Sequence, residues 1–433
     1  MARSALVLGG GIIGTTTAWF LAERGFDVTV LERRDGVGLE TSFANGGLLT
    51  PSQADPWNAP GTTLRLLRWL GREDSPLLLR PRALPGMLSW GLRFLLASRR
   101  APYERAAQAS LRLGLYSVRT LDELRASLGL AYDDRQIGTI KIFQDAASLA
   151  ASVALGRLLA DGGLRFQALD ADAAVEREPA LAPIRAQLAG AVHYPADESG
   201  DAYKFTRAIA AAAEARGVQF RFGVTVKQIR RGSGGVTAIE TDSGEYTADA
   251  YVLTAGCHSH GLGKACGLRL PVYPAKGYSA TVPLGGWQGA PAIPIVDFER
   301  KLVVTPLGDR LRIAGTAEFT GYDTTLNTAR SDSVLHQALN IFPDFAPHVD
   351  PAQVSRWTGL RPMTPDGPPI IGTTPCRNLF VNTGHGPLGW TFAAGSSRLA
   401  ADVVAGLEPE IDLEGLTYSR FGSSPLSLRE RVG

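Results

Sequence analysis

The stretch from Ser4 to Glu32, SALVLGGGIIGTTTAWFLAERGFDVTVLE, constrains the fold more than any other part of this chain. Its apolar beginning, Ser4–Leu8, predicts a short buried strand. The run GGGIIG at residues 9–14 then fits the pattern G-x-G-x-x-G, and a helix is expected over about 12–24. Asp27–Leu31 alternates apolar residues as a second strand would. Strand, glycine turn, helix and strand in this order are typical of a βαβ unit that binds a dinucleotide.

Each glycine of that pattern, and the acidic residue after the second strand, has its own physical role. Gly9 permits the tight turn, Gly11 lets the backbone approach a pyrophosphate, and Gly14 lets the helix pack closely on the strand. Free N–H groups at the helix start would face the phosphates. Glu32 follows the second strand, where its carboxylate can accept hydrogen bonds from a ribose. The alternatives are a glycine turn in an ordinary α/β core, or a secretory signal, against which the triple glycine and the acid argue.

Length and composition limit the remaining possibilities. A chain of 433 residues predicts two domains, and 45% hydrophobic with 20% charged residues is ordinary for a globular protein. A net charge of +2 gives no case for nucleic acid. The three cysteines form no C-x-x-C, so neither a disulfide framework nor a metal site is expected, and a reducing compartment fits best. No run long enough for a membrane span is evident.

Two further segments have cofactor-binding character. Small and polar residues cluster after Glu40, namely Thr41, Ser42, Asn45, Gly46 and Gly47, and would suit either a loop over a cofactor or a plain polar loop. A buried strand at Ala250–Thr254 is followed at once by Ala255 and Gly256. Small residues at the end of such a strand can lie against a cofactor at the carboxyl edge of the sheet.

The block from Trp357 to Ala394 contains a second strand–turn–helix unit. GLRPMTPDG begins at Gly359, and a strand at Leu379–Asn382 runs into TGHGPLGWT, followed by a helix expected over about 392–405. The start of that helix would direct its positive end towards an anionic or electron-rich group.

Residues 65–100 have a different character. Eight arginines are opposed there only by Glu73 and Asp74, with leucine, tryptophan and phenylalanine between them. A basic amphipathic pair of segments can lie on an anionic membrane surface. The favoured alternative is that these segments are helices packed on the protein's own core with their arginines in water, because most such stripes are core stripes. The sequence leaves both open.

Elsewhere, periodicity predicts helices over about 103–128, 146–161 and 204–216, and residues 271–354 read as β-rich, including strands at Tyr278–Val282, Lys301–Thr305 and Arg310–Ala314. The chain resembles the D-amino acid oxidase superfamily of flavoproteins in its N-terminal unit and in four further motifs, GLRPMTPDG, NTGHGPLGWT, ETSFANGG and PVYPAKGYS. Within it, the resemblance is to the bacterial D-amino acid dehydrogenases, and it covers nearly the whole chain.

That resemblance implies a mixed α/β fold with a Rossmann-like FAD-binding domain, residues 1–60, 196–270 and 355–433, and a β-rich substrate domain, residues 61–195 and 271–354. It implies FAD as the cofactor, and no tether for a covalent flavin is evident. The residues implied to bind FAD are Gly9, Gly11, Ile12, Ile13, Gly14, Glu32, Arg33, Thr41, Ser42, Asn45, Gly46, Val226, Ala255, Gly256, Gly384, Gly386, Leu388, Gly389, Trp390 and Thr391.

The resemblance also implies catalytic-site residues. Arg361 matches the arginine of the G-[LF]-R-P motif that binds the substrate carboxylate, unless it is a structural arginine bonded to loop carbonyls. Tyr278 is a weaker candidate for the pocket, with a half-buried strand position as its alternative, and His385 is expected as a wall beside the flavin. Oxidases of the family carry a pocket tyrosine on the strand where this chain has Leu302 and Val303, which favours a dehydrogenase.

The expected activity is oxidative deamination of D-amino acids to 2-oxo acids and ammonia, with electrons passed to a respiratory acceptor such as quinone. The alternatives are a D-hydroxyproline, glycine or sarcosine dehydrogenase or oxidase on the same scaffold, and a non-catalytic flavin subunit that passes electrons within a complex. The expected location is cytoplasmic, with peripheral contact at the inner membrane and no nucleic-acid partner.

Overall fold

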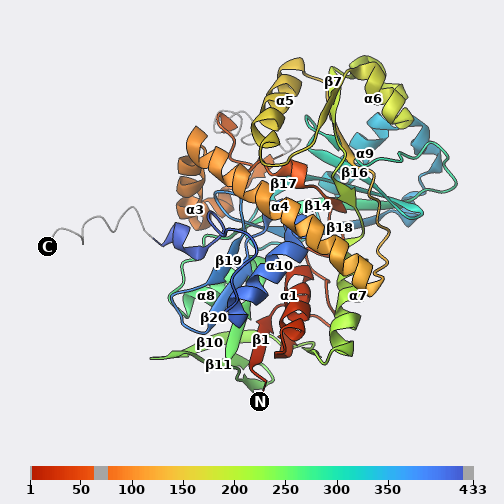
Figure 1. Cartoon of the computed structure of the whole chain (residues 1–433). Coiled ribbons are helices and arrows are strands. Elements are labelled where there is room, and N and C mark those ends of the chain that lie inside the picture. Colours follow the sequence, from red (N-terminus) through yellow and green to blue (C-terminus); the bar gives the residue numbers. More distant parts are fainter. Residues whose placement is uncertain (1, 63–76, 423–433) are drawn as a thin grey trace.

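Two large sheets organise the protein. The computed structural model describes residues 2–62 and 77–422, and the part of the predicted basic region at 65–76 lies outside these described residues. Figure 1 shows the first sheet, with β1, β19 and β20, in the lower half of the molecule, and the second, with β14, β16 and β17, above it. The N-terminal unit predicted from the sequence therefore forms the middle of the lower sheet.

The first sheet has six strands in the order β19 (Ile370–Thr373), β20 (Leu379–Thr383), β13 (Ala250–Leu253), β1 (Ser4–Leu8), β2 (Asp27–Leu31) and β9 (Gln219–Arg221). All neighbours are parallel except β19 and β20. Because parallel strands end at one common edge, the turns after β1, β2 and β13 are brought together there.

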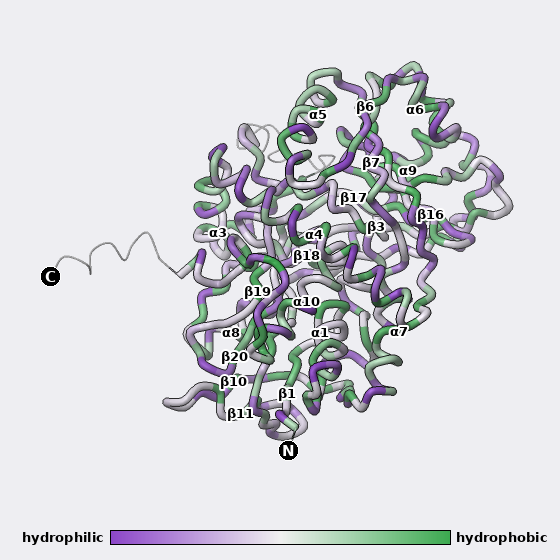
Figure 2. Tube along the Cα trace, viewed as in Figure 1, coloured by the Kyte–Doolittle hydropathy of each residue, from purple (hydrophilic) through white to green (hydrophobic). Residues whose placement is uncertain are grey.

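Helices cover one face of this sheet and a small sheet covers the other. The first face carries α1 (Ile12–Glu23), α7 (Ala202–Ala215) and α10 (Gly389–Ala405), and the long α4 (Arg100–Leu128) packs across α10. Trp19, Phe20 and Phe205 belong to the core between them, and the hydrophobic residues of β1 and α1 appear green in Figure 2. The opposite face is covered by the sheet of β10 (Val226–Gly232), β11 (Gly235–Thr241) and β12 (Gly244–Tyr246).

The second sheet follows the order β18 (Ser355–Met363), β14 (Tyr273–Pro283), β17 (Arg310–Phe319), β16 (Leu302–Leu307), β15 (Ile295–Asp297), β5 (Thr139–Phe143), β7 (Gly190–Tyr194) and β6 (Gln167–Leu169), with β4 (Leu77–Leu79) beside β17. Helix α9 (Thr328–Ile341) and α6 (Ala171–Arg177) pack on one side of it. Alternating side chains therefore divide into a core face and an opposite face directed at the first sheet.

The remaining elements lie around these layers. They are α3 (Leu84–Ala97), α5 (Ala146–Ala160), α8 (Ser259–Lys264), and a two-stranded pairing of β3 (Leu48–Leu49) with β8 (Glu198–Ser199). In the parts of the chain that the structure describes, no helix combines the length and the apolar character that crossing a membrane requires.

The predicted mixed α/β class is confirmed, with two differences in detail. Residues 271–354 contain helix α9 as well as strands, because Asn327 caps its start and Val334, Ala338 and Ile341 bury one face. Strand β18 pairs with β14 in the second sheet, although the predicted boundary at 355 assigns it to the cofactor domain. The division into two domains stays a prediction, and α4, which it assigns to the substrate domain, packs on α10 beside the first sheet.

Candidate active site

The glycine turn after β1 combines close packing with open space. Gly9 has a φ of +115°, which favours glycine, and a Cβ atom at Gly14 would lie 1.8 Å from the Gly9 carbonyl oxygen. Gly11 differs, because a Cβ atom there would meet only the Ser42 Oγ, at 3.6 Å, and its φ of −69° is ordinary. Gly14 is thus required by the packing of α1 on β1, whereas the space at Gly11 belongs to the cavity.

Glu32 stabilises the same turn. Its Oε2 accepts a hydrogen bond from Gly10 N at 2.7 Å, and its Oε1 accepts one from Arg34 N at 2.8 Å. The side chain is buried, but it borders the cavity, so lone pairs of both oxygens remain for a ribose. Across the turn, Ser42 Oγ accepts from Ile12 N at 3.1 Å, which leaves the serine proton available to a phosphate.

One cavity of about 1470 Å³ extends from this turn to the second sheet. It exceeds the roughly 300–1,000 Å³ of an ordinary ligand site. The predicted cofactor residues that line it are Gly9, Gly11, Ile12, Ile13, Glu32, Arg33, Thr41, Ser42, Asn45, Gly46, Val226, Ala255, Gly256, Gly386, Leu388, Gly389 and Trp390. Gly14, Gly384 and Thr391 lie behind the wall, and the Thr391 Oγ1 accepts a hydrogen bond from Thr50 N at 3.0 Å.

Side chains of the second sheet hold the loop at residues 44–46 by donating hydrogen bonds to the carbonyl groups of the loop. Ser279 Oγ, Arg312 Nη1 and Thr305 Oγ1 donate to the carbonyl oxygens of Ala44, Asn45 and Gly46, respectively, each at 2.7 Å. Three successive carbonyls are thereby fixed on the second sheet while Asn45 and Gly46 border the cavity. A ring system between the two sheets would be held by this loop, so the residues present fit a flavin.

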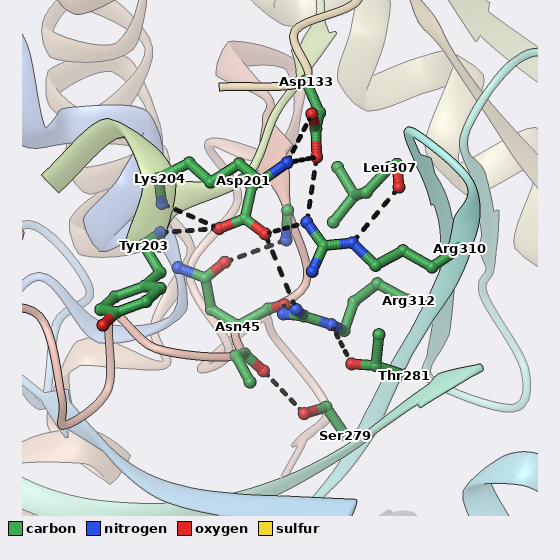
Figure 3. Close-up of polar contacts among 12 residues, drawn as sticks. Asn45, Asp133, Asp201, Tyr203, Lys204, Ser279, Thr281, Leu307, Arg310 and Arg312 are labelled. Atoms are coloured by element: carbon green, nitrogen blue, oxygen red, sulfur yellow. Dashed lines mark hydrogen bonds and ion pairs between the residues drawn. The ribbon is translucent and has the colours of Figure 1, made fainter. Parts of the chain in front are cut away.

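An ionic network supports that loop from behind (Figure 3). Asp201 caps α7 by accepting from Tyr203 N at 2.9 Å, and its other oxygen accepts from Arg310 at 2.9 Å. The same carboxylate lies 4.0 Å from Arg312. Burial lowers the pKa of Arg312 to about 10, partly offset by Asp201, so the guanidinium stays charged at neutral pH. The donor to Asn45 is therefore a charged, fixed group.

Arg361, in strand β18, places a cation in the wall of the cavity. Its Nη1 donates to the Thr316 carbonyl at 3.0 Å, and its guanidinium lies 5.8 Å from the ring of Trp57. Among the described residues it pairs with no carboxylate, and burial lowers its pKa to about 10, so it remains charged. A partly buried cation without a counter-ion favours an anionic ligand.

Two residues shape the space around Arg361. A Cβ atom at Gly277 would lie 2.4 Å from the guanidinium carbon, so only glycine leaves room for it. Thr316 has a φ of +54°, an outlier for a β-branched residue, and it lies where the pairing of β14 with β17 shifts register. This bulge turns the Thr316 carbonyl towards Arg361. Residues in such conformations concentrate at functional sites.

The other two predicted catalytic residues have different positions. Tyr278 is 1% exposed and its hydroxyl donates to Glu318 at 2.5 Å. It also lines the cavity, so its place in the substrate pocket stays a prediction. His385 borders the cavity as the predicted wall, with Nε2 at 3.0 Å from Ser396 Oγ. Burial lowers the pKa of His385 to about 3, so it is neutral at physiological pH.

His385 should therefore make stability pH-dependent. Its pKa is near 3 when folded and 6.5 in the ordinary state, so the unfolded chain binds the proton first as pH falls. The contribution of the neutral, buried His385 to the free energy of unfolding is complete above pH 6.5 and is lost as pH falls towards 3. Between pH 7 and pH 5 the free energy of unfolding should fall by about 2 kcal/mol. We expect His385→Gln to lack this component, measured by urea unfolding at both pH values. Equal losses in wild type and variant would contradict the neutral, buried histidine.

Sequence reasoning missed several residues that build the site: Trp57, Gly277, Ser279, Thr305, Arg312 and Thr316. Only Gly277 carried a signal, since a glycine inside a predicted strand indicates a close approach of another group. The rest act through register and packing between strands distant in the chain, which local patterns do not report.

Comparisons with known proteins agree with this geometry. The family model DAO, FAD dependent oxidoreductase, matches residues 4–403. A D-amino acid dehydrogenase of Paramagnetospirillum magneticum is 46% identical over 419 residues, covering 96% of this chain and 99% of the relative. A D-amino acid dehydrogenase of Rhizobium johnstonii is 43% identical over 417 residues, covering 96% and 99%.

Solved structures show the same fold. Glycine oxidase from Geobacillus kaustophilus matches with a TM-score of 0.74 and 26% identity, over 97% of this chain and 99% of that one. L-proline dehydrogenase from P. horikoshii matches with a TM-score of 0.76 and 18% identity, over 97% and 98%. The expectations of an enzyme and of FAD are confirmed: the chain belongs to the DAO family of FAD-dependent oxidoreductases.

Proposed function

We propose that this enzyme oxidises D-amino acids to 2-oxo acids and ammonia and delivers the electrons to a respiratory quinone. The observation that carries the proposal is Arg361, a partly buried guanidinium in the wall of the cavity that pairs with no carboxylate among the described residues. Its planar fork matches a carboxylate through two hydrogen bonds. The D-amino acid dehydrogenases among the relatives support this substrate class.

The chain's own residues supply binding and orientation. Gly11, Glu32 and the loop at 44–46 would hold FAD without a covalent link, and bound FAD supplies the acceptor for the hydride of the substrate Cα–H. Arg361 fixes the carboxylate, and this anchoring restricts how the Cα–H can face the cofactor. The substrate amine must be neutral, and the buried His385 is not a base in this scheme, because its ring is held as a wall.

The substrate and the products can be tested together. Purified enzyme incubated without oxygen with D-alanine and a water-soluble quinone should form pyruvate, ammonia and quinol in equal amounts. Glycine, sarcosine and D-hydroxyproline, tested in parallel, separate the other amine substrates of this scaffold. If one of these three substrates is turned over faster than every D-amino acid tested, the substrate assignment is wrong. If the enzyme turns over with oxygen but not with quinone, the proposed acceptor is wrong.

Helix α3 supports a lipid-soluble acceptor. Of its fourteen residues only Trp90 is buried, whereas Leu88 and Leu92 are 69% and 61% exposed. Both leucines border the cavity. Arg93 lies on the same helix, and Arg99 and Arg100 follow it. An exposed apolar helix face with basic residues fits the surface of an anionic membrane, and here it lies beside the route into the site.

Replacing both leucines should weaken vesicle binding. We expect the double variant Leu88→Gln, Leu92→Gln to lose most of its recovery with anionic vesicles at low salt, because the apolar contact is removed. Wild-type recovery should fall as salt rises. Leu158→Gln, on α5 and also exposed, is the control. Equal recovery of wild type with neutral and anionic vesicles would refute the attraction to anionic lipid, and recovery with neither would refute membrane contact. Neither result bears on the proposed activity.

A further inference from the structure

A second cation faces the same cavity, away from Arg361. Lys141 in β5 is 8% exposed, and it lines the cavity. Within residues 2–62 and 77–422 its ammonium makes no hydrogen bond or ion pair, and its described contacts are the rings of Phe298, at 5.1 Å, and Phe143, at 6.0 Å. A buried ammonium with no hydrogen-bond partner is costly unless a ligand completes it.

The register of the second sheet places Lys141 in line with the cofactor loop. Lys141 pairs with Val296, Val296 with Val303, and Val303 with Ala314, so the four side chains share one face. A Cβ atom at Gly46 would lie 3.8 Å from both Val303 and Ala314. Strand β5 is three strand spacings, about 14 Å, from β17, where the Thr316 carbonyl accepts from Arg361, the proposed carboxylate anchor. A substrate side chain and the lysine side chain can span that distance between them.

An acidic residue borders the same end of the cavity. Asp55 also lines the cavity, and it follows Ala54, which packs with Phe143 and Phe298. Burial by itself lowers the pKa of Lys141, but the negative charges around it, Asp55 foremost, raise the pKa above its ordinary value. Although the two charges interact, no ion pair joins Lys141 to Asp55 among the described residues. Both groups line the cavity, so their hydrogen-bonding capacity is available to a ligand there.

We propose that Lys141 and Asp55 form a side-chain subsite that selects amino acids with a carboxamide side chain. This inference rests on the proposed function. The amide oxygen accepts from Lys141 and the amide nitrogen donates to Asp55. A side-chain carboxylate is repelled by Asp55, and a cationic side chain by Lys141. A hydrocarbon leaves both charged groups unsatisfied, which a site built for hydrogen bonding penalises strongly.

The test compares substrates of similar length. We expect the wild-type holoenzyme to be reduced by D-glutamine more efficiently than by D-methionine, in kcat/KM measured by anaerobic stopped flow. Lys141→Met should lower that ratio about tenfold or more, mainly through the D-glutamine value. Lys301→Met is the matched control, because Lys301 also lines the cavity but is exposed. It should change the ratio less than about twofold, as expected for an exposed charge.

Asp55→Asn provides an independent second arm. Removing the negative charge should raise the efficiency for D-glutamate relative to D-glutamine, again by about tenfold. An unchanged D-glutamine to D-methionine ratio in Lys141→Met, or an equal fall in Lys301→Met, would overturn the subsite. If D-alanine also fails to reduce the flavin in wild type, the proposed function itself fails. Reduction by D-alanine with unchanged ratios refutes the subsite alone.

Discussion

Replacing Gly11 with valine should give a folded protein that is isolated without FAD. A Cβ atom at this position meets only Ser42 Oγ, at 3.6 Å, and the backbone φ suits any residue. The branched side chain would instead fill the space where the backbone must approach a pyrophosphate. We expect visible flavin absorbance to disappear, with far-UV circular dichroism and a cooperative thermal transition retained.

Gly14→Ala is the matched control for this prediction. Its Cβ atom would lie 1.8 Å from the Gly9 carbonyl oxygen, so α1 could not pack on β1, and the fold itself should fail. Wild-type protein should be yellow and should release its FAD on heat denaturation, because no covalent bond joins FAD to the protein in this proposal. Gly11→Val protein with wild-type FAD content would contradict the placement of the pyrophosphate at this turn.

Arg361→Lys should damage turnover far more than flavin binding. Lysine keeps the charge but loses the planar fork that bonds a carboxylate twice. A charge-assisted hydrogen bond is worth about 1.5–3 kcal/mol, which predicts about a ten- to hundredfold fall in kcat/KM. Arg361→Ala should fall further, because the substrate carboxylate would enter a pocket without a counter-charge. The flavin spectrum should barely change in either variant.

The comparison of acid with amide isolates the role of Arg361. Anaerobic flavin reduction is measured with D-alanine and with D-alaninamide, which lacks the carboxylate. Wild type should strongly prefer the acid, and both variants should lose that preference. Variants that still prefer the acid as wild type does would show that Arg361 is not the carboxylate partner. In that case its bond to the Thr316 carbonyl would be its whole role.

The N-terminal unit could be predicted because its signals are local. The strands predicted at Ser4–Leu8 and Asp27–Leu31 have those same limits in the structure, since an apolar run bounded by glycine and charge specifies each one. The helix predicted over about 12–24 is α1, Ile12–Glu23. Here periodicity, turn chemistry and burial all agree, so tertiary contacts did not override the local pattern.

Long-range pairing explains what the sequence did not reveal. GLRPM, with its proline and glycine, does not read as a strand, yet every one of residues 359–363 lies opposite a residue of β14 in an antiparallel pairing. The bulge at Thr316 likewise arises from the pairing of β14 with β17. The bond from the Tyr278 hydroxyl to Glu318, forty positions along the chain, also joins two different strands. Each of these features depends on a partner strand that no local window contains.

The central claim is that D-amino acids, anchored at Arg361, reduce the bound flavin. The most direct test is to mix the purified enzyme with D-alanine or L-alanine in the absence of oxygen and any other acceptor, and to follow the flavin absorbance. We expect rapid bleaching by D-alanine, none by L-alanine, and recovery of the oxidised spectrum when a quinone is added. An oxidised flavin that persists with D-alanine and with every other D-amino acid would contradict this claim.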